Sequence, residues 1–310
     1  MDATDCTPID VLCIGHAAYD LSFFVDSFPV ENNKYQTEAM LESCGGPAAN
    51  AAYLLSKWNC RCAFAGLVGD DAYGREIEAS LARVNTDVSL LELRTNHPTP
   101  VSLILVNQAN GSRTIVNRSL PQATFRVDPD EWRKRHPKVL LFDGHALEAS
   151  LAALDAYPDA ISILDAGSQR KGTVELAGRV DFVVASERFA TQVTELSRLD
   201  NLHRQRLCIG RLREQFPGPI AVTIGEHGYL LEDDDGFVHE PAFPVNAVDT
   251  TAAGDIFHGA FAFAMHADLS FRKSLRVASA AAALSVQTRG GRPSVPDLAD
   301  VETLLQHHFS

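Results

Sequence analysis

Short, continuously apolar runs recur along most of the chain, and amphipathic segments separate them. Strands that are covered by helices on both faces are apolar at every position, so these runs predict a buried parallel sheet. The predicted strands are Val11–Ile14, Ala63–Val68, Val139–Phe142, Ile161–Leu164, Phe182–Val184 and Ile220–Ile224. Segments with helical spacing lie between them, including Ala48–Trp58, Arg75–Val84 and Ala146–Ala156. Such alternation predicts an α/β fold with helices on both faces of the sheet.

Two regions break this alternation because they contain strand patterns with no helix between them. In the first, Leu21–Val25 and Tyr35–Leu41 flank a polar turn at Pro29–Lys34. In the second, Val101–Val106 and Thr114–Val116 flank the Asn-Gly pair Asn110–Gly111, which favours a tight hairpin. These strands predict a small separate sheet that would act as a lid. The alternative is a pair of ordinary surface hairpins.

Nothing in the sequence divides the chain into independent domains. We expect one α/β domain over residues 9–310 that follows a tail of residues 1–8, with lid strands inserted at about residues 21–43 and 99–118. The last part of the chain has the pattern of three helices, at Ala253–His266, Phe271–Val286 and Asp297–His307.

Charge and cysteine content narrow the class of protein. The 310 residues include 27 Lys and Arg against 40 Asp and Glu, a formal net charge of −13, and 45% of them are hydrophobic. This balance suits a soluble enzyme that acts on small molecules and gives no general attraction to nucleic acid or to an anionic membrane. The 6 cysteines lack the spacing of a disulfide framework or a zinc site. With no signal peptide and no membrane-spanning apolar run, we expect a cytoplasmic protein with reduced thiols.

The most informative motif is Asp249-Thr-Thr-Ala-Ala-Gly-Asp255, which precedes an apolar helical pattern. Small residues that open a helix leave free backbone N–H groups at the positive end of the helix dipole, where a phosphate can bind. A carboxylate in that first turn would repel phosphate, so Asp255 is better suited to accept a proton from an incoming hydroxyl. The alternative is that Asp255 only caps the helix.

A second motif, Ser43-Cys-Gly45-Gly46-Pro-Ala-Ala-Asn50, follows a predicted strand and opens a predicted helix. Two glycines allow a ligand to approach the main chain closely. Asn50 offers both a donor and an acceptor, which suits the recognition of hydroxyl groups. The alternative is an ordinary turn between a strand and a helix.

Together these motifs resemble the two signatures of the ribokinase-like (PfkB) family of carbohydrate kinases. Asp249–Asp255 resembles the second signature, and Gly45–Asn50 with the downstream segment Gly66–Gly74 resembles the first. The resemblance extends from about Val11 to Pro296. It implies a three-layer α/β/α fold with a mostly parallel central sheet and a small β lid. It also implies ATP-dependent phosphorylation of a hydroxymethyl group, with Mg²⁺ accompanying the nucleotide.

The same resemblance implies roles for individual residues. Asp255 would be the catalytic base, and its backbone amide with those of Ala253 and Gly254 would form the anion hole. The sugar hydroxyls would be bound by Asp20, Gly45, Gly46 and Asn50. The nucleotide would lie beside the turn that contains Thr223, Gly225 and Gly228. A monovalent cation, K⁺, would bind where many members of the family hold one, at Asp249, Thr251, Gly290 and Ser294.

Three departures from the family pattern matter. Ala252 stands beside the nucleotide where the signature usually has glycine, and we expect it to be tolerated if its φ is negative. The element N-x-x-E, which is associated with magnesium and phosphate, is replaced by Ser186-Glu187-Arg-Phe189, so Glu187 is the one candidate left. Pro47 stands where typical ribokinases have lysine, which weakens a ribose assignment.

Within the family, the GGPAA form of the first signature and the TRGGRP loop look most like sulfofructose kinases. Lys34 and Asn117 occupy positions that could meet a charged sugar tail. His145, however, stands where that subgroup uses an arginine, and a neutral imidazole binds a sulfonate less well than a guanidinium does.

Two further functions stay open at this level. A nucleoside kinase of the same fold would need an aromatic wall for the base, which Phe23, Phe24 and Tyr35 could supply. A binding or regulatory protein that lost turnover would fit Ala252 and the altered Ser186–Phe189 element, although the intact Asp255 speaks against it. An exposed edge of the lid sheet is compatible with a homodimer.

Overall fold

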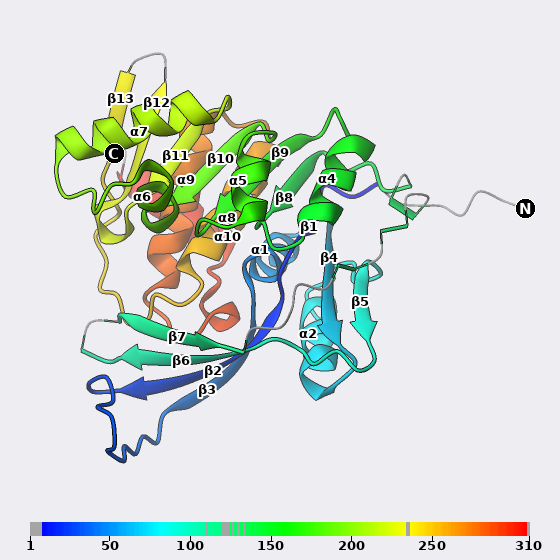
Figure 1. The fold of residues 1–310 in the computed structure, drawn as a ribbon, viewed down its shortest axis with the longest axis vertical. Coiled ribbons are helices and arrows are strands. Elements are labelled where there is room, and N and C mark those ends of the chain that lie inside the picture. The colour runs from blue at the N-terminus through cyan, green and yellow to red at the C-terminus, as the bar shows by residue number, and fades with distance from the viewer. Residues whose placement is uncertain are drawn as a thin grey trace, which may run out of the picture.

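The computed structural model describes residues 8–109, 111–118, 124–125, 127–128, 131–132, 134–233 and 236–308. Among these residues, the main element is a nine-stranded sheet with the strand order β13-β12-β11-β10-β9-β8-β1-β4-β5 (Figure 1). In chain order its strands are β1 (Val11–Ile14), β4 (Cys62–Gly69), β5 (Leu91–Arg94), β8 (Val139–Phe142), β9 (Ile161–Ala166), β10 (Phe182–Ser186), β11 (Ile220–Thr223), β12 (Tyr229–Asp233) and β13 (Gly236–Glu240).

The sheet is parallel except at one edge. Strand β1 pairs in parallel with β4 and β8, and the parallel pairing continues from β8 through β9 and β10 to β11. Strands β12 and β13 are antiparallel additions beyond β11. All six strands predicted from apolar runs are therefore confirmed, whereas β5, β12 and β13 were missed.

Helices cover both faces of the sheet, which gives three layers. Strand β1 shows how its residues are divided between two cores: Val11 and Cys13 pack on one side, and Leu12 and Ile14 on the other. The first core also contains side chains of α1 (Pro47–Lys57), α2 (Ala72–Ala82), α8 (Ala253–His266), α9 (Phe271–Ser285) and α10 (Leu298–His308). The second contains side chains of α4 (Leu147–Ala156), α5 (Lys171–Ala177), α6 (Glu187–Thr194) and α7 (Leu202–Gln215).

A separate four-stranded sheet forms from the two regions that lacked helical patterns. Its order is β3-β2-β6-β7, with β2 (Ala18–Val25), β3 (Met40–Gly45), β6 (Val101–Asn107) and β7 (Arg113–Asn117). Figure 1 shows this small sheet projecting from one end of the main domain. The predicted strand Tyr35–Leu41 was wrong at its start, because β3 begins only at Met40. Asn110 of the predicted hairpin turn lies outside the described residues.

The small sheet contacts the loops that flank α8 and α9. Arg113 Nη1 donates to Thr250 Oγ1 across 2.7 Å, and that hydroxyl donates to Gly111 O across 3.1 Å. Arg289 Nη2 donates to Gln108 Oε1 across 2.9 Å, and its guanidinium lies 4.6 Å from the centre of the Phe24 ring. The β6–β7 end of the small sheet is therefore held against the turn that precedes α8.

Two further expectations concern the whole chain. The five described cysteines, Cys13, Cys44, Cys60, Cys62 and Cys208, are all free and buried. No helix in the described part of the chain has both the length and the apolar character that a membrane span requires.

Candidate active site

The turn before α8 is fixed by Asp249, which is 1% exposed. Its Oδ1 accepts from the amide of Thr251 (2.9 Å) and its Oδ2 from the amide of Gly290 (2.8 Å), so one carboxylate joins two loops. Ala252 then precedes the helix with φ 60 and ψ 8, in the left-handed region. The condition for tolerating alanine, a negative φ, is therefore not met, and a non-glycine residue in this conformation is strained by about 1 kcal/mol.

The first turn of α8 presents backbone amides to open space. The amide of Ala253 donates to Thr250 O across 3.3 Å, so it is already engaged. No hydrogen bond from the amide of Gly254 or Asp255 is found among the described residues. A Cβ at Gly254 would meet no heavy atom within 4 Å. The start of α8 therefore has room for a phosphate and two amides that can bind it.

Asp255 lies in this first turn and contacts the other signature motif. Asn50 Nδ2, from α1, donates to Asp255 Oδ2 across 2.7 Å. Burial, with the nearby Asp165 carboxylate at the end of β9, raises the pKa of Asp255 to about 7, while Asn50, His258 and Arg113 act in the opposite direction. A carboxylate with a pKa near neutral is well matched to accept a proton from a hydroxyl.

Asp20 lies against the glycine pair at the start of α1. A Cβ at Gly45 would stand 1.9 Å from Asp20 Oδ2, and one at Gly46, where φ is 97, would stand 2.5 Å from the backbone oxygen of His16. Gly46 therefore requires glycine, whereas a Cβ at Gly45 would displace the Asp20 carboxylate. Burial raises the pKa of Asp20 to about 6, although the Ser102 hydroxyl and Arg292 oppose this shift. Asp20 thus lies against Gly45 before α1, and Asn50, whose backbone amide donates to Gly46 O, links this segment to Asp255.

Asn117 belongs to the same row of the small sheet as Asp20. Asp20 is the register partner of Ser102 in β6, and Ser102 is in turn the partner of Asn117 in β7. Lys34 is exposed in the loop between β2 and β3, and no contact places it near this row among the described residues.

His145 lies in a cluster of basic side chains after β8. Its ring stacks on that of His16 with a centroid distance of 4.5 Å, and its Nε2 contacts the guanidinium of Arg170. Burial lowers the pKa of both imidazoles, so both are neutral at pH 7. Asp143 accepts from the amides of His16 (2.7 Å) and Ala48 (3.2 Å), which ties this cluster to the first turn of α1. His145 also lines a cavity of about 240 Å³.

The predicted nucleotide turn lies at the carboxyl ends of β10 and β11. Thr223 ends β11 and is in register with Ser186, the last residue of β10. Gly225 (φ 62) begins one turn of 3₁₀-helix and Gly228 (φ 96) follows it, and a Cβ at Gly228 would stand 2.0 Å from Glu240 O. In open α/β sheets, ligands bind outside the carboxyl ends of parallel strands.

Glu187 is partly engaged elsewhere. Its Oε1 accepts from the amide of Leu199 across 3.1 Å, which fixes the segment between α6 and α7. This contact gives the carboxylate a structural role that the sequence did not suggest.

The residues predicted to bind a cation are adjacent in the structure. Besides the bond from Gly290 to Asp249, Ser294 Oγ donates to Gly291 O across 2.7 Å. Thr251 Oγ1 is buried and has no hydrogen-bond partner within the described part of the chain. A hard cation is bound by oxygen atoms of this kind, so the donor set fits one.

A different cluster of possible ligand atoms lies at the opposite end of the sheet. Asp10 precedes β1, Cys60 precedes β4 and His266 ends α8, and the possible ligand atoms of the three lie close together. Asp10 already receives the backbone amide of Arg61 (3.0 Å) and its guanidinium. Arg61 therefore balances the charge of Asp10, whereas His266 Nδ1 is buried and finds no hydrogen-bond partner among the described residues. Because His266 ends α8 and Asp255 lies in its first turn, the cluster is separate from the candidate active site.

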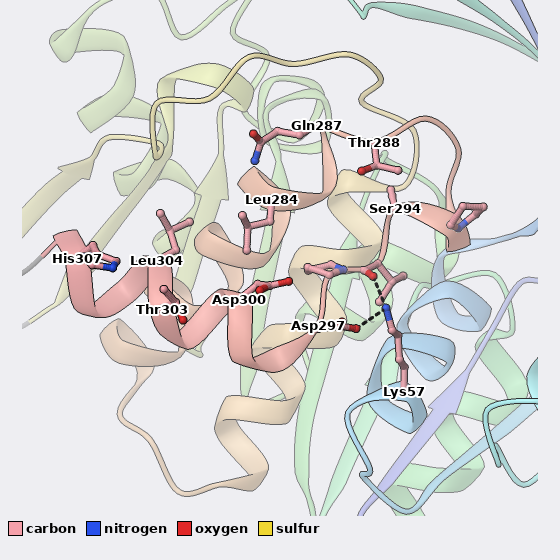
Figure 2. Close-up of a pocket in the computed structure, with 13 residues that line it drawn as sticks. Lys57, Leu284, Gln287, Thr288, Ser294, Asp297, Asp300, Thr303, Leu304 and His307 are labelled. Carbon is pink, nitrogen blue, oxygen red and sulfur yellow. Dashed lines mark hydrogen bonds and ion pairs between the residues drawn. The ribbon is translucent and has the colours of Figure 1, made fainter.

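A surface groove of about 580 Å³ runs along α10 and the segment 293–297 (Figure 2). Lys57 Nζ binds Val295 O (2.6 Å) and Asp297 Oδ1 (2.9 Å) on its wall. Neither Asp20, Asn50 nor Asp255 lines it. The groove therefore does not belong to the candidate active site.

Comparison with known proteins identifies the class. A model of the pfkB family of carbohydrate kinases matches residues 8–298, so the chain belongs to that family and is a carbohydrate kinase, a phosphotransferase. Its fold is the ribokinase-like one.

Particular relatives make the comparison sharper. The deoxyribokinase of Salmonella typhi is 28% identical over 305 residues, covering 96% of this chain and 99% of the relative. A crystal structure from Agrobacterium tumefaciens, provisionally assigned as a ribokinase, is 30% identical with a TM-score of 0.86 and covers 98% of this chain and 99% of that one. Arabidopsis thaliana ribokinase complexed with ribose and ATP is 24% identical with a TM-score of 0.80, covering 97% and 99%, and shows the shared fold. Since these relatives are ribokinases and a deoxyribokinase, the likeness to sulfofructose kinases stays a prediction.

Proposed function

We propose that the chain transfers the γ-phosphoryl group of ATP to a primary hydroxyl of a small carbohydrate. The observation that carries the proposal is the bond between Asn50 and Asp255, which unites the two signature motifs at the open start of α8. ATP would be the phosphoryl donor, and Mg²⁺ bound with it would offset the negative charge of its phosphates, as in other phosphoryl transfers. A related ribokinase binds ribose and ATP, which supports this choice of reactants.

The roles of the chain's own residues follow from their positions. Asp20, Gly45, Gly46 and Asn50 hold the sugar, and Asp255 accepts the proton of its hydroxyl at Oδ1, the oxygen that Asn50 leaves free. The amides of Gly254 and Asp255 bind the charge that develops on the transferred group. The small sheet acts as a lid that excludes water from the site.

The test is a panel of ketoses, aldoses, sugar acids, sulfosugars and nucleosides with Mg·ATP, with ADP formation and the phosphorylated product both measured. Phosphorylation of at least one sugar supports the proposal. Preferred phosphorylation of a nucleoside would show that the acceptor is a nucleoside and not a sugar. Binding of ATP without phosphorylation of any compound in the panel would favour a regulatory protein instead.

An anionic sugar is a second candidate acceptor. His145 itself lacks the positive charge that would bind a sulfonate or carboxylate, but Arg170 brings a guanidinium into contact with its Nε2. A nucleoside acceptor has less support, because Phe24 is only 3% exposed within the small sheet and offers no free face to a nucleobase. If the acceptor is anionic, Arg170→Gln should raise its KM about 10-fold or more. The KM of neutral sugars should change little.

We also infer that a monovalent cation binds beside the turn before α8. The unpartnered hydroxyl of Thr251 and the adjacent Asp249, Gly290 and Ser294 support this. Activity measured in K⁺ should exceed activity measured in a tetraalkylammonium salt of equal ionic strength. Equal rates in the two salts would remove the cation from the proposal.

A homodimer through the small sheet is a further part of this proposal. The small sheet presents apolar side chains to solvent on its two edge strands, namely Met40 (50% exposed) on β3 and Ile115 (45%) and Val116 (58%) on β7. Light scattering after size-exclusion chromatography should give twice the chain mass, and Val116→Glu should shift the protein towards the monomer. A monomer at micromolar concentration would contradict this.

A further inference from the structure

A buried arginine lies behind the catalytic carboxylate. Arg292, the first residue of the short helix η2 (Arg292–Ser294), is 5% exposed. Its Nε donates to Asn50 Oδ1 across 3.3 Å, and Asn50 Nδ2 donates to Asp255 Oδ2 across 2.7 Å. The three side chains come from the loop after α9, from α1 and from α8. They form a chain of hydrogen bonds from a fixed cation to the proposed base.

The chemistry of the two outer groups fixes the orientation of the amide between them. A guanidinium only donates hydrogen bonds, and an ionised carboxylate only accepts them. A reversed Asn50 amide would set N–H against N–H at Arg292 and oxygen against oxygen at Asp255. Without Arg292, only the single bond to Asp255 would select the orientation, and an amide can meet a protonated carboxyl group either way round.

We propose that Arg292 is a positioning residue for phosphoryl transfer. It holds the Asn50 amide in the orientation that ties Asp255 Oδ2 and leaves Asp255 Oδ1 to receive the proton of the acceptor. This inference rests on the proposed function, because it takes Asp255 as the base. It assigns to the loop after α9 a part in catalysis besides contact with the small sheet.

The surroundings of Arg292 argue against a merely structural role. Its Nη1 and Nη2 are buried, and neither finds a hydrogen-bond partner in the described ranges of the chain. Its guanidinium lies 5.3 Å from the centre of the Tyr53 ring, a contact that compensates only part of the lost hydration. Burial of a cation whose donors are not all hydrogen-bonded costs free energy. Stability alone therefore gives no reason for an arginine here.

The charged groups around Asp255 set the direction of a pH effect. Asp165 faces it from β9, Arg113 from β7 and His258 from its own helix. Burial and Asp165 raise the pKa of Asp255, and the bond from Asn50 lowers it. If Arg292 no longer orders the Asn50 amide, the carboxylate loses part of that bond. The pKa of Asp255 then rises. As the pH is lowered, Asp255 is therefore protonated, and activity is lost, at a higher pH than in the wild type.

The experiment is a double-mutant cycle on kcat/KM, measured as a function of pH with the best acceptor found for the wild type. Its variants are Arg292→Met, Asn50→Ala and the two together. Arg292→Met should lower kcat/KM about 10–100-fold, the range expected for a hydrogen bond from a charged group. The acid limb of its profile should move to higher pH. In the Asn50→Ala background, the same substitution should change kcat/KM by less than about 3-fold, because its partner is gone.

Two further variants separate positioning from folding. Arg211→Met, on α7, removes a half-buried arginine that donates to Thr194 O across 2.5 Å, and it should leave the pH profile unchanged. Arg292→Lys keeps the charge but loses the planar donor group, and it should retain part of the activity lost in Arg292→Met. If Arg292→Met does not fold, the cycle is run with Arg292→Lys, for which the same non-additivity is expected.

The outcomes distinguish this inference from the proposed function. A loss of equal size with and without Asn50, or an acid limb that does not move, overturns the positioning role even when the wild type is an active kinase. Normal turnover by Arg292→Met overturns it as well. If the wild type phosphorylates nothing, the proposed function fails first and the positioning role falls with it.

Discussion

A carboxylate lies at each end of helix α8, Asp255 within its first turn and Asp10, from the segment before β1, beside its last residue. The two carboxylates differ in their hydrogen-bond partners. At the start, Asp255 receives a side-chain hydrogen bond from Asn50, and burial raises its pKa to about 7. At the other end, His266 Nε2 lies 3.9 Å from Asp10 Oδ1, and Arg61 binds the same carboxylate with its amide and its guanidinium. Burial alone would raise the pKa of Asp10, but the bonds from Arg61 lower it overall.

The difference separates stability from chemistry within one helix. The hydrogen bonds from Arg61 favour the ionised form of Asp10, so this carboxylate stabilises the fold and has little tendency to take up a proton. Asp255 is incompletely satisfied and keeps a pKa at which it can accept one. Carboxylates with strongly shifted pKa values cluster at functional sites, so the contrast agrees with the proposed catalytic role of Asp255.

The largest expected effect is at Asp255. Asp255→Asn keeps the shape of the side chain and can still accept from Asn50, but it removes the proposed base, so kcat should fall about 10²–10⁴-fold. Initial rates with saturating acceptor and Mg·ATP measure this, with circular dichroism as a check on folding. Turnover within a few-fold of the wild type would show that Asp255 is not the base. The start of α8 would then not differ from its other end in function.

The next effect is at Asp10, where stability should change and kcat should not. Asp10→Asn loses the charge-assisted bonds from Arg61 and should lower the free energy of unfolding by about 1–3 kcal/mol. Its kcat should stay within about 2-fold of the wild type, because the substitution lies at the opposite end of α8. Urea denaturation and the kinase assay test both points. A loss of kcat comparable to that of Asp255→Asn would show that the two ends do not differ in kind.

The sequence predicted most of the main sheet because its strands are apolar throughout. Strands β12 and β13 escaped this criterion, since acidic residues such as Glu232 and Asp233 interrupt or end the apolar pattern near the edge. Tyr35–Leu41 has strand-forming residues, but Thr37 Oγ1 binds Phe24 O instead, and the ladder begins only at Met40. Tertiary contacts override local propensity in this segment.

The site was predictable where its residues are close in sequence. Gly45, Gly46 and Asn50 form one motif, and Asp255 ends another. Arg292 was missed because its contact with Asn50 joins residues 242 positions apart, which only the fold brings together. Asp165 and His258 were missed as well, although a polar residue at the carboxyl end of the predicted strand Ile161–Leu164 was a usable signal.

The pH dependence of stability should differ in sign between the two carboxylates. Because the folded pKa of Asp255 is raised to about 7, ionisation of this group destabilises the fold, fully above pH 7 and not at all well below pH 4. Asp255→Asn should therefore raise Tm at pH 8, by roughly 2–4 °C for each kcal/mol relieved, and by less at pH 5. The pKa of Asp10 is lowered, so Asp10→Asn should lower the free energy of unfolding most at neutral pH. This loss of stability should shrink as the pH falls below 4. Equal changes in the Tm of Asp255→Asn at pH 8 and pH 5 would contradict the raised pKa of Asp255.

The smallest expected effect is at Ala252, which lets the chain enter α8 with φ 60. Ala252→Gly should relieve about 1 kcal/mol of left-handed strain, but it also frees the unfolded chain by about 0.4–1 kcal/mol. The net gain in stability should thus be below about 1 kcal/mol, seen as a higher urea midpoint with an unchanged m-value. The matched control is Ala253→Gly, one residue further on within the helix, where glycine has no strain to relieve and should lower the midpoint. If both substitutions lower the midpoint equally, the turn before α8 is not strained.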